Sequence, residues 1–252
     1  HGLLVANLAS PPGRYVLLSK FEDSLRLRGR EIFFSGHQYP GTFFPDKVLL
    51  REFILDDYPA FLFTADLPGP GTPPGGQGGA PAGGTIRLRK SVLMVGGEDA
   101  VLVRYDLEAG PAGAVLRLRP FLAYRGRHAL SRRNPFLQAG VEPAPNGFSM
   151  TPYQGMPPLY LQTNRKGRFI AAPVWYENFE YVRERERGYD WHEDLFTPGI
   201  LEVPVRTGQA VVVRAATTPG SAALHRLWQR EAGGRRTAAM CGRGPAPGRT
   251  AP

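Results

Sequence analysis

The stretch TIRLRKSVLMV, residues 85–95, alternates apolar and charged side chains along its first half. Ile86 and Leu88 fall on one side of an extended chain. Arg87 and Arg89 fall on the other side. Successive side chains of a β-strand point to opposite faces of its sheet, so this alternation predicts an antiparallel strand with one buried face.

The same period of two recurs along most of the chain. It is clear in AVLVRYDL (100–107) and in AVLRLRPFLAY (114–124). We expect further strands in LLVANL, RYVLLSKF, REIFFSG, VLLREFIL, AFLFTADL, GFSMTP, LYLQT, GRFIAAPVWY, ILEVPV and AVVVRAAT. Turn-forming pairs such as Pro40-Gly41 and Asn146-Gly147 separate these segments. Many short strands, without a long helical pattern before residue 221, predict an all-β fold: a large antiparallel β-sandwich with a short C-terminal helix.

Two segments hold too few apolar residues to pack. Residues 66–84, DLPGPGTPPGGQGGAPAGG, predict a flexible loop between two strands. Residues 237–252 continue an Arg-, Gly-, Pro- and Ala-rich composition, and we expect a disordered tail there.

One segment near the C-terminus predicts a helix, SAALHRLWQREAGGRR at 221–236. Leu224, Leu227 and Trp228 recur at the spacing that places them on one face of a helix. Ser221 can accept a hydrogen bond from the first helical turn and serve as its N-cap.

The net charge of +9 at pH 7 and the pI of about 10.0 raise the question of a nucleic-acid partner. Most of this charge is local, because residues 221–252 hold six Arg against one Glu. Elsewhere acidic and basic residues are interspersed, as on an ordinary protein surface. The charge pattern therefore argues against a nucleic-acid function.

The cysteine and histidine content excludes several site types. A single cysteine, Cys241, cannot form an intramolecular disulfide framework or a cysteine-based zinc site. The five histidines lack the HxH or i, i+4 spacing that favours metal binding. The sequence contains no run of 18 apolar residues, so it predicts no membrane-spanning helix. We expect a protein without cofactor or metal, located in the cytoplasm.

The least ordinary segment is WYENFEYVRERERGYDWHEDLFTPG, residues 175–199, which mixes aromatic rings with alternating Arg and Glu. Its acids could flank a sugar as a catalytic pair, but the neighbouring arginines favour an ion-pair network instead. Its aromatic rings could stack on pyranose rings or could simply belong to the core. Considered alone, these residues do not establish an enzyme.

Five motifs together resemble a known family. They are HGLLVANLASPPGRYVLLSKFEDSL (1–25), GHQYPGTFFPD (36–46), LRLRPFLAYRGRHALSRRNP (116–135), PPLYL (157–161) and NFEYVRERERGYDWHEDLFTPG (178–199). In this order they resemble the N-terminal domain of bacterial- and archaeal-type glycogen debranching enzymes. In that family the domain is a β-supersandwich, and a helical toroid that follows it carries the amylo-α-1,6-glucosidase activity.

The resemblance implies which parts of a debranching enzyme this sequence holds. Residues 1–218 correspond to the supersandwich, a galactose-mutarotase-like fold, and residues 219–236 to a linker helix leading toward the toroid. The family pattern starts slightly upstream of His1, and residues 237–252 resemble nothing in the family. The toroid is missing from this sequence, and the catalytic acids of the family belong to it. We therefore assign no catalytic residue and expect the chain to be inactive alone.

On this basis we expect residues 175–199 to form a loop on the sandwich that faces the catalytic domain. Interdomain ion pairs are expected from the alternating charges Arg183, Glu184, Arg185, Glu186 and Arg187. One wall of the glucan cleft is expected from the substrate-binding residues Trp175, Tyr176, Asn178, Tyr181, Trp191 and Asp194.

The leading hypothesis is therefore a non-catalytic domain of a glycogen-debranching α-1,6-glucosidase, a glycoside hydrolase of glycogen breakdown. Its expected partners are the helical catalytic domain and glycogen or a branched α-glucan, with no nucleic acid and no membrane. Two alternatives stay open. The chain could be an autonomous α-glucan-binding module, or a self-sufficient glycosidase that uses Glu184 or Asp190 together with Asp194.

Overall fold

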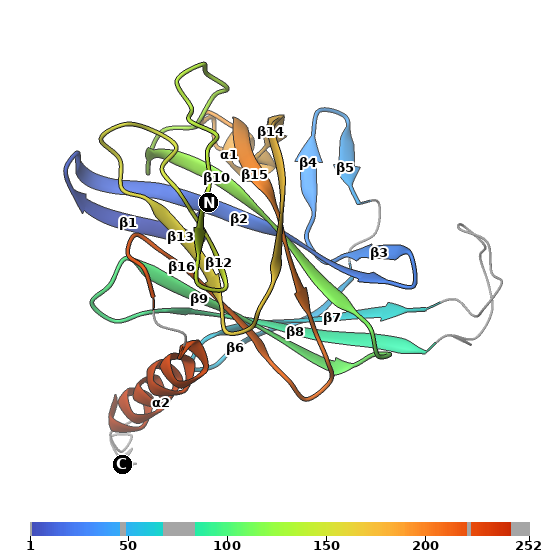
Figure 1. Cartoon of the computed structure of the whole chain (residues 1–252). Helices are drawn as coiled ribbons and strands as arrows, with labels where there is room; N and C mark the ends of the chain where they lie inside the picture. Colours follow the sequence, from blue (N-terminus) through green and yellow to red (C-terminus); the bar gives the residue numbers. More distant parts are fainter. Residues whose placement is uncertain (1, 46–48, 68–83, 221–222, 243–252) are drawn as a thin grey trace, which may run out of the picture.

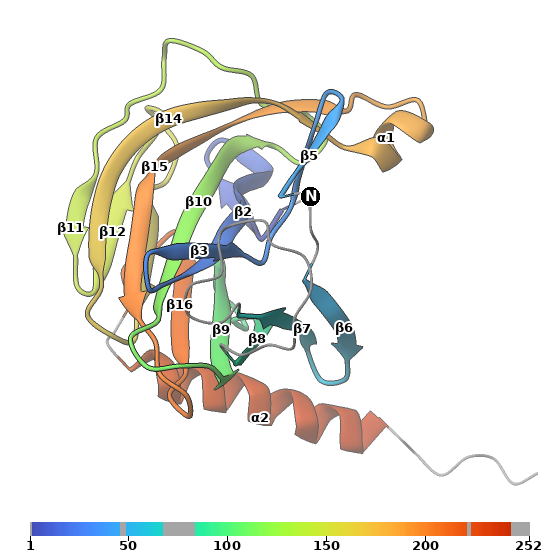
Figure 2. The same ribbon diagram turned by 90° about the vertical axis from the view of Figure 1, so that its right-hand side faces the viewer.

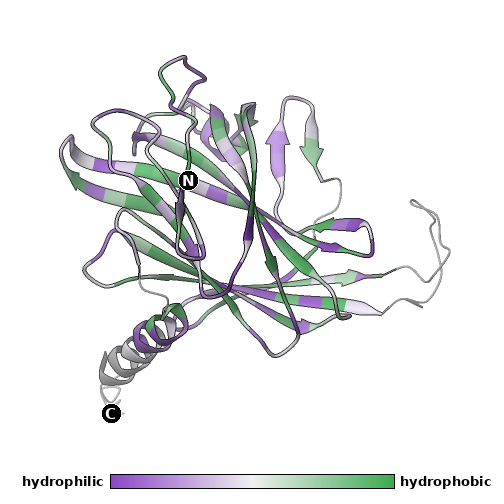
Figure 3. Cartoon of the chain, viewed as in Figure 1, coloured by the Kyte–Doolittle hydropathy of each residue, from purple (hydrophilic) through white to green (hydrophobic). Residues whose placement is uncertain are grey.

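The computed structural model describes residues 2–45, 49–67, 84–220 and 223–242 (Figure 1). Within them, two large antiparallel sheets pack face to face and enclose the main hydrophobic core (Figures 1 and 2). This arrangement confirms the predicted all-β sandwich. Figure 3 shows apolar and polar residues alternating along many of the strands, as the sequence pattern requires.

The first sheet contains, in spatial order, β1 (Leu4–Ala9), β2 (Pro12–Leu27), β10 (Val115–Gly126), β15 (His192–Pro204) and β14 (Arg168–Glu180), with β3 (Arg30–Phe33) also paired to β2. The second sheet contains β11 (Glu142–Ala144), β12 (Gly147–Met150), β13 (Leu159–Thr163), β16 (Val211–Ala216), β9 (Ala100–Ala109), β8 (Thr85–Met94), β7 (Pro59–Asp66) and β6 (Leu50–Leu55). A separate ribbon consists of β4 (His37–Tyr39) and β5 (Thr42–Phe44).

Every predicted strand segment contains a strand in the structure. The ribbon, the short β11 and a single helical turn, α1 (Val182–Glu186), were not predicted. Most of the predicted loop at 66–84, residues 68–83, lies outside the described residues.

The prediction of a loop at 175–199 is wrong. Its first residues complete β14, its last residues begin β15, and these two strands pair antiparallel on either side of α1. The period of two is hidden in β15 because both faces of this strand are buried from Glu193 to Val203. A strand buried on both faces carries apolar and paired polar residues on each, so its sequence does not alternate.

The main core lies between the two sheets and includes one buried polar bridge. Asp23 of β2 points into the sandwich and is fully buried. It accepts a hydrogen bond of 2.8 Å from the Tyr105 hydroxyl and pairs with the Lys90 ammonium, both of which belong to the second sheet. Burial and the nearby Asp23 carboxylate raise the pKa of Tyr105. This bridge satisfies a carboxylate that would otherwise be unpaired in the core.

Helix α2 (Leu224–Gly242) covers part of the outer face of the second sheet (Figures 1 and 2). Leu224 and Trp228 are buried against the sheet and Leu227 is partly buried, which confirms the predicted apolar face. The helix continues past its predicted end at residue 236, because Ala and Met at 238–240 are strong helix formers. The proposed cap Ser221 and residues 243–252 of the expected tail lie outside the described residues.

Candidate functional site

Four of the five family-like motifs meet at one end of the first sheet. They contribute β2, the β4–β5 ribbon, the segment that contains β10 and the residues after it, and the end of the β14–α1–β15 hairpin. Figures 1 and 2 show the ribbon beside the α1 end of this hairpin. We call this group of elements the motif cluster. Because these motifs are far apart in sequence, their meeting on one outer face marks it as the candidate site.

An apolar layer on the outer face of the first sheet forms the floor of the motif cluster. Its buried members are Val16, Phe121, Ala123, Phe179 and Leu195, with Tyr39 and Tyr176 packed against them. Alternation along β10 separates this layer from the main core, because Leu118 and Leu122 point inward while Phe121 and Ala123 point outward. The ring centroids of Tyr39 and Phe179 lie 5.0 Å apart, which joins the ribbon to β14.

Glu193 is the fully buried centre of a polar network beside this floor, with 0% of its surface exposed. The Arg125 guanidinium pairs with its carboxylate through two nitrogens, Nε and Nη2. The backbone N–H and the hydroxyl of Ser131 both donate to Oε1 at 3.1 Å, and the Tyr181 hydroxyl donates to Oε2. Burial and the neighbouring Glu193 raise the pKa of Tyr181. This carboxylate thus joins β15 to β10, to the segment after β10 and to Tyr181.

Asp194, a predicted substrate-binding residue, is also buried, and its carboxylate accepts hydrogen bonds from backbone N–H groups. Its Oδ1 accepts the N–H of Asn178 at 2.8 Å, and its Oδ2 accepts the N–H of Arg133 at 3.0 Å. Asn178, also predicted to bind substrate, has a left-handed φ of 62° at an irregularity in the β14–β15 pairing. Asp194 therefore positions Asn178 and the loop after β10. This use of both oxygens argues against Asp194 as one acid of a glycosidase pair.

A second group of ionisable side chains lies between the ribbon and β2. Glu22 approaches the His37 Nε2 at 2.9 Å and the Arg119 Nε at 3.3 Å. The Lys20 ammonium lies 4.7 Å from the ring centroid of Phe179. Burial is the largest influence on all three pKa shifts resolved in this group. It lowers the pKa of Lys20 to about 8, lowers that of His37 and raises that of Tyr39 to about 12.

The predicted aromatic residues do not form one surface. Trp175 faces the interior side of the sheet, with its ring centroid 5.6 Å from that of Phe196. Tyr176 faces the opposite side, where the centroids of its ring and the Phe121 ring lie 5.0 Å apart. The Arg119 guanidinium lies 5.2 Å from the ring centroid of Tyr176. Neighbours along a strand must diverge in this way, so the two residues cannot contact one ligand from the same face.

Trp175 lines an open groove of about 710 Å³ at the edge of the sandwich. The groove lies between β14 and the loop that follows β10, and its lining residues are Arg133, Asn134, Pro135, Leu137, Ala139, Pro173, Val174, Trp175 and Phe196. Sequence reasoning missed this loop, although its first residues are part of a family-like motif.

The alternating charges of residues 183–187 pair within their own segment. Arg183 pairs with Glu186 at 2.9 Å, and Arg187 pairs with Glu184 at 3.5 Å. Arg185 lies 3.8 Å from Glu180. Arg185 also places its guanidinium 4.9 Å from the ring centroid of Trp191, another predicted substrate-binding residue. The alternation therefore stabilises α1 locally, and contact with another domain stays a prediction.

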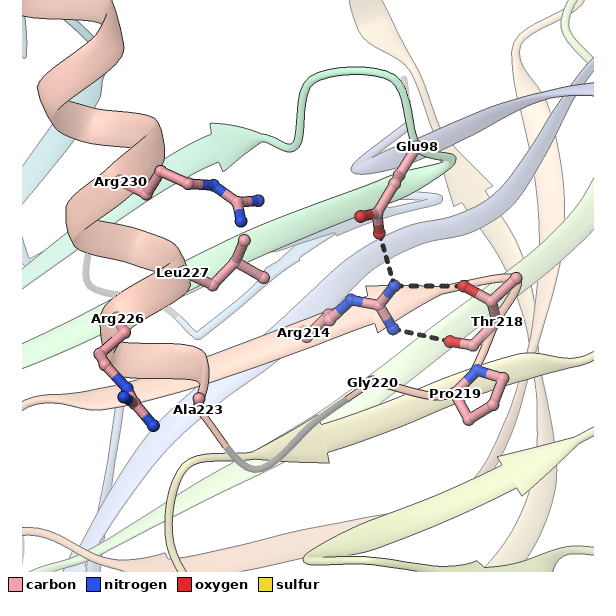
Figure 4. Close-up of a pocket in the computed structure, with 9 residues that line it drawn as sticks. All are labelled: Glu98, Arg214, Thr218, Pro219, Gly220, Ala223, Arg226, Leu227 and Arg230. Carbon is pink, nitrogen blue, oxygen red and sulfur yellow. Dashed lines mark hydrogen bonds and ion pairs between the residues drawn. The ribbon is translucent and has the colours of Figure 1, made fainter.

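A different polar group fixes the turn between β16 and α2 (Figure 4). Arg214 is buried and donates hydrogen bonds to the Thr218 carbonyl at 2.6 Å and to Glu98 at 2.8 Å. Gln162 accepts the N–H of Gly220 at 2.6 Å. A Cβ at Gly220 would lie 3.0 Å from Arg214 Nη1, so glycine suits this close approach. The pocket of about 460 Å³ bordered by this turn is lined on the α2 side by Ala223, Arg226, Leu227 and Arg230.

Among the described residues, neither helix has the length and apolar composition of a membrane span. The same residues contain no group of three or more His, Cys, Asp or Glu side chains arranged to hold a metal ion.

Comparison with known proteins identifies a family. The family model described as "Glycogen debranching enzyme N terminal" matches residues 1–212, which include both large sheets except the last strand residues of β16. No curated protein matches the chain at a significant level.

Proposed function

Because the chain belongs to the family of glycogen debranching enzyme N-terminal domains, we propose that it is a non-catalytic domain of such an enzyme. It packs against a helical catalytic domain and supplies part of the wall of the glucan cleft. Its partners are then this catalytic domain and glycogen or a branched α-glucan.

The state of the candidate acids supports a non-catalytic role. Glycoside hydrolysis needs two carboxyl groups that flank the sugar, one of them able to give a proton to the leaving oxygen. Asp194 and its neighbour Glu193 are buried and bonded to protein groups, Glu184 pairs with Arg187, and Asp190 is exposed between α1 and β15. The buried acids maintain the fold of the motif cluster, so we assign catalysis to the partner domain.

The groove beside Trp175 is the observation that carries the cleft-wall role. An aromatic ring beside apolar surface suits the flat apolar face of a pyranose ring, and Leu137 and Pro173 supply further apolar lining. Asn134 and Arg133 place polar groups at the same groove. Such a combination of one stacking ring with a few polar groups is typical of carbohydrate sites, and we assign the predicted substrate contact to Trp175 first.

The test is Trp175→Ala in a full-length debranching enzyme that contains this domain. We expect the dissociation constant for a branched dextrin to rise about three- to tenfold, since one aromatic contact is worth roughly 0.5–1.5 kcal/mol. Phe53→Ala is the matched control, because Phe53 is an exposed aromatic residue on β6 at the far edge of the other sheet. Unchanged affinity and turnover in Trp175→Ala would show that the groove is not part of the glucan cleft.

The alternative is an autonomous α-glucan-binding module that uses the same groove. Calorimetric titration of the 252-residue chain with maltodextrin separates the two functions. The docking function predicts weak or no binding by the chain alone. The module function predicts binding that Trp175→Ala abolishes and Phe53→Ala preserves.

A further inference from the structure

The β4–β5 ribbon is attached to the sandwich by side chains. It forms a two-stranded sheet of its own, and its backbone is paired with neither large sheet. It covers the aromatic floor of the motif cluster through His37 and Tyr39. An element held in this way can leave the sandwich without breaking a large sheet.

His37 is the central attachment of the ribbon, with 1% of its surface exposed. The ring centroids of Phe121 and Phe179 each lie 5.4 Å from its own centroid, and that of Phe44 lies 6.2 Å away in a parallel stack. Its Nε2 contacts Glu22 at 2.9 Å. Its Nδ1 is buried without a hydrogen-bond partner among the described residues.

The surroundings of Nδ1 favour the neutral form of the His37 ring. A neutral His37 can donate from Nε2 to Glu22 and keep an unprotonated Nδ1 among the aromatic rings. A protonated ring carries a hydrogen on Nδ1 as well, and that charged donor has no acceptor there. Buried charged donors without an acceptor are disfavoured, so protonation opposes the closed ribbon.

The charges around His37 act on its protonation in both directions. Glu22 faces the ring and favours its protonation, while Lys20 of the same strand opposes it. The adjoining elements carry further charged or titratable groups, which include Asp23 of β2, Arg119 of β10, Tyr176 of β14, Glu193 of β15 and Tyr39 of the ribbon. Glu193 is engaged by Arg125, and Asp23 by Lys90 and Tyr105, so neither is available to neutralise His37.

We propose that the ribbon is a proton-sensitive clasp, closed over the aromatic floor of the motif cluster while His37 is neutral and released when His37 takes up a proton. Burial lowers the pKa of His37 below its ordinary value of 6.5. Closure is therefore unaffected by this group above pH 6.5, and it weakens as the pH falls from 6.5 toward the lower pKa of the closed state. Release uncovers the rings of Phe121 and Phe179 beside α1.

Hydrogen exchange of the 252-residue chain, followed by mass spectrometry at several pH values, tests this clasp. We expect the protection factors of residues 37–44, corrected for intrinsic exchange rates, to fall at least tenfold between pH 7.5 and pH 5.0. Residues 100–109 of the central strand β9 serve as the internal reference and should keep their protection. Equal ribbon protection at both pH values overturns the proposal.

Two variants identify the titrating group. His37→Phe keeps an aromatic ring that cannot take up a proton, so the ribbon should lose its pH response. His192→Phe is the matched control, because His192 belongs to the same cluster but lies 3.5 Å from Glu180 outside the ribbon contact, and it should retain the response. If ribbon protection still depends on pH in His37→Phe, His37 is not the titrating group.

A measurement on the unmodified chain decides the question if His37→Phe does not fold. The ring resonances of His37 in a labelled sample report its protonation directly by NMR. The clasp requires that ring protonation and loss of ribbon protection share one pH midpoint. A protonated His37 with a still protected ribbon overturns the proposal.

Discussion

Each large sheet has a small element on its outer face, and these two covers are built in different ways. Helix α2 lies on the second sheet through an apolar cluster that includes Leu102, Val212 and Trp228. The ribbon lies on the first sheet through aromatic rings mixed with ionisable groups such as Lys20 and His37. The burial of apolar surface holds α2 in place, whereas the ribbon also depends on the pairing of buried charges.

The difference shows where specific geometry is needed. Apolar contact has no preferred direction, so the helix needs only the right period and size to stay bound. A buried charge is stable only when its partners lie at defined positions, as they do in the motif cluster. Most of the family-like motifs lie at the ribbon end of the first sheet, whereas α2 begins after the last matched residue.

The largest expected effect is the loss of the buried carboxylate in the polar cover. Glu193→Ala leaves the Arg125 guanidinium, Ser131 and Tyr181 without their shared acceptor. Removal of one partner from a buried ion pair costs about 3–5 kcal/mol, so we expect the free energy of unfolding to fall by about 4 kcal/mol. Urea denaturation followed by circular dichroism measures this change.

Two controls sharpen this result. Glu177→Ala removes an acid whose side chain is 45% exposed and which pairs with Arg133, and it should change the unfolding free energy by less than about 0.5 kcal/mol. The double variant Glu193→Ala with Arg125→Leu should cost less than the sum of the single changes, because it removes the stranded charge. Additive losses would show that the two side chains are not coupled.

A somewhat smaller effect is expected in the apolar cover. Trp228→Ala removes the largest side chain that fixes α2, including its edge-on contact with Tyr58 at a centroid distance of 5.4 Å. Large aromatic truncations cost about 3–5 kcal/mol, and we expect a loss of about 3 kcal/mol because the helix can detach before the sandwich unfolds. The loss should not depend on pH between 5 and 9, which unfolding curves across that range can check.

Gln229→Ala is the matched control for the helix, since Gln229 is the exposed neighbour of Trp228. We expect it to leave the unfolding curve unchanged within about 0.5 kcal/mol. A pH-dependent loss in Trp228→Ala would mean that the two covers are not as different as their contacts indicate.

The smallest expected effect is a gain in stability. The pKa of Lys20 falls from 10.5 to about 8 in the fold, mainly through burial, so its charged form opposes folding at neutral pH. Lys20→Met should stabilise the protein by about 1 kcal/mol at pH 7, after allowance for the lost contact with Phe179. Below pH 8 the penalty in the unmodified chain is complete, and it disappears as the pH rises from 8 to 10.5.

The stability difference between Lys20→Met and the unmodified chain should therefore shrink toward zero as the pH approaches 10.5. Paired urea titrations at pH 7 and pH 10 measure it. A variant less stable than the parent at pH 7 would show that the ammonium contributes more through Phe179 and Gly36 than it loses by burial.

The sequence predicts strands well wherever one face meets solvent or a uniform core. The first half of the segment at 85–95 is such a case, because Arg87 and Arg89 point outward while Ile86 and Leu88 point into the core. Prediction failed over the first part of β15, residues 192–199, where a covered outer face removes the alternation. The ribbon was missed for another reason: its two strands are three residues each, too short for a period to appear.

Prediction of the site was partial. Trp175 was named from its residue type, but its separation from Tyr176 follows only from the sheet geometry. Lys20, Glu22 and His37 were not named, although charges inside the apolar strand segment YVLLSKFEDSL were an available signal. Glu184 and Glu193 look alike in the sequence, yet one lies on the surface turn α1 and the other is fully buried.

From the sequence alone follow the β-sandwich, its family and the apolar face of the C-terminal helix, because period and motif order are local properties of the chain. Only the tertiary structure decides which acids are buried, which aromatic rings share a surface and what the ribbon covers. These outcomes depend on contacts between residues far apart in sequence, such as Glu193 with Arg125 and His37 with Glu22. The strength of such contacts is set by burial, and burial exists only once the sheets have assembled.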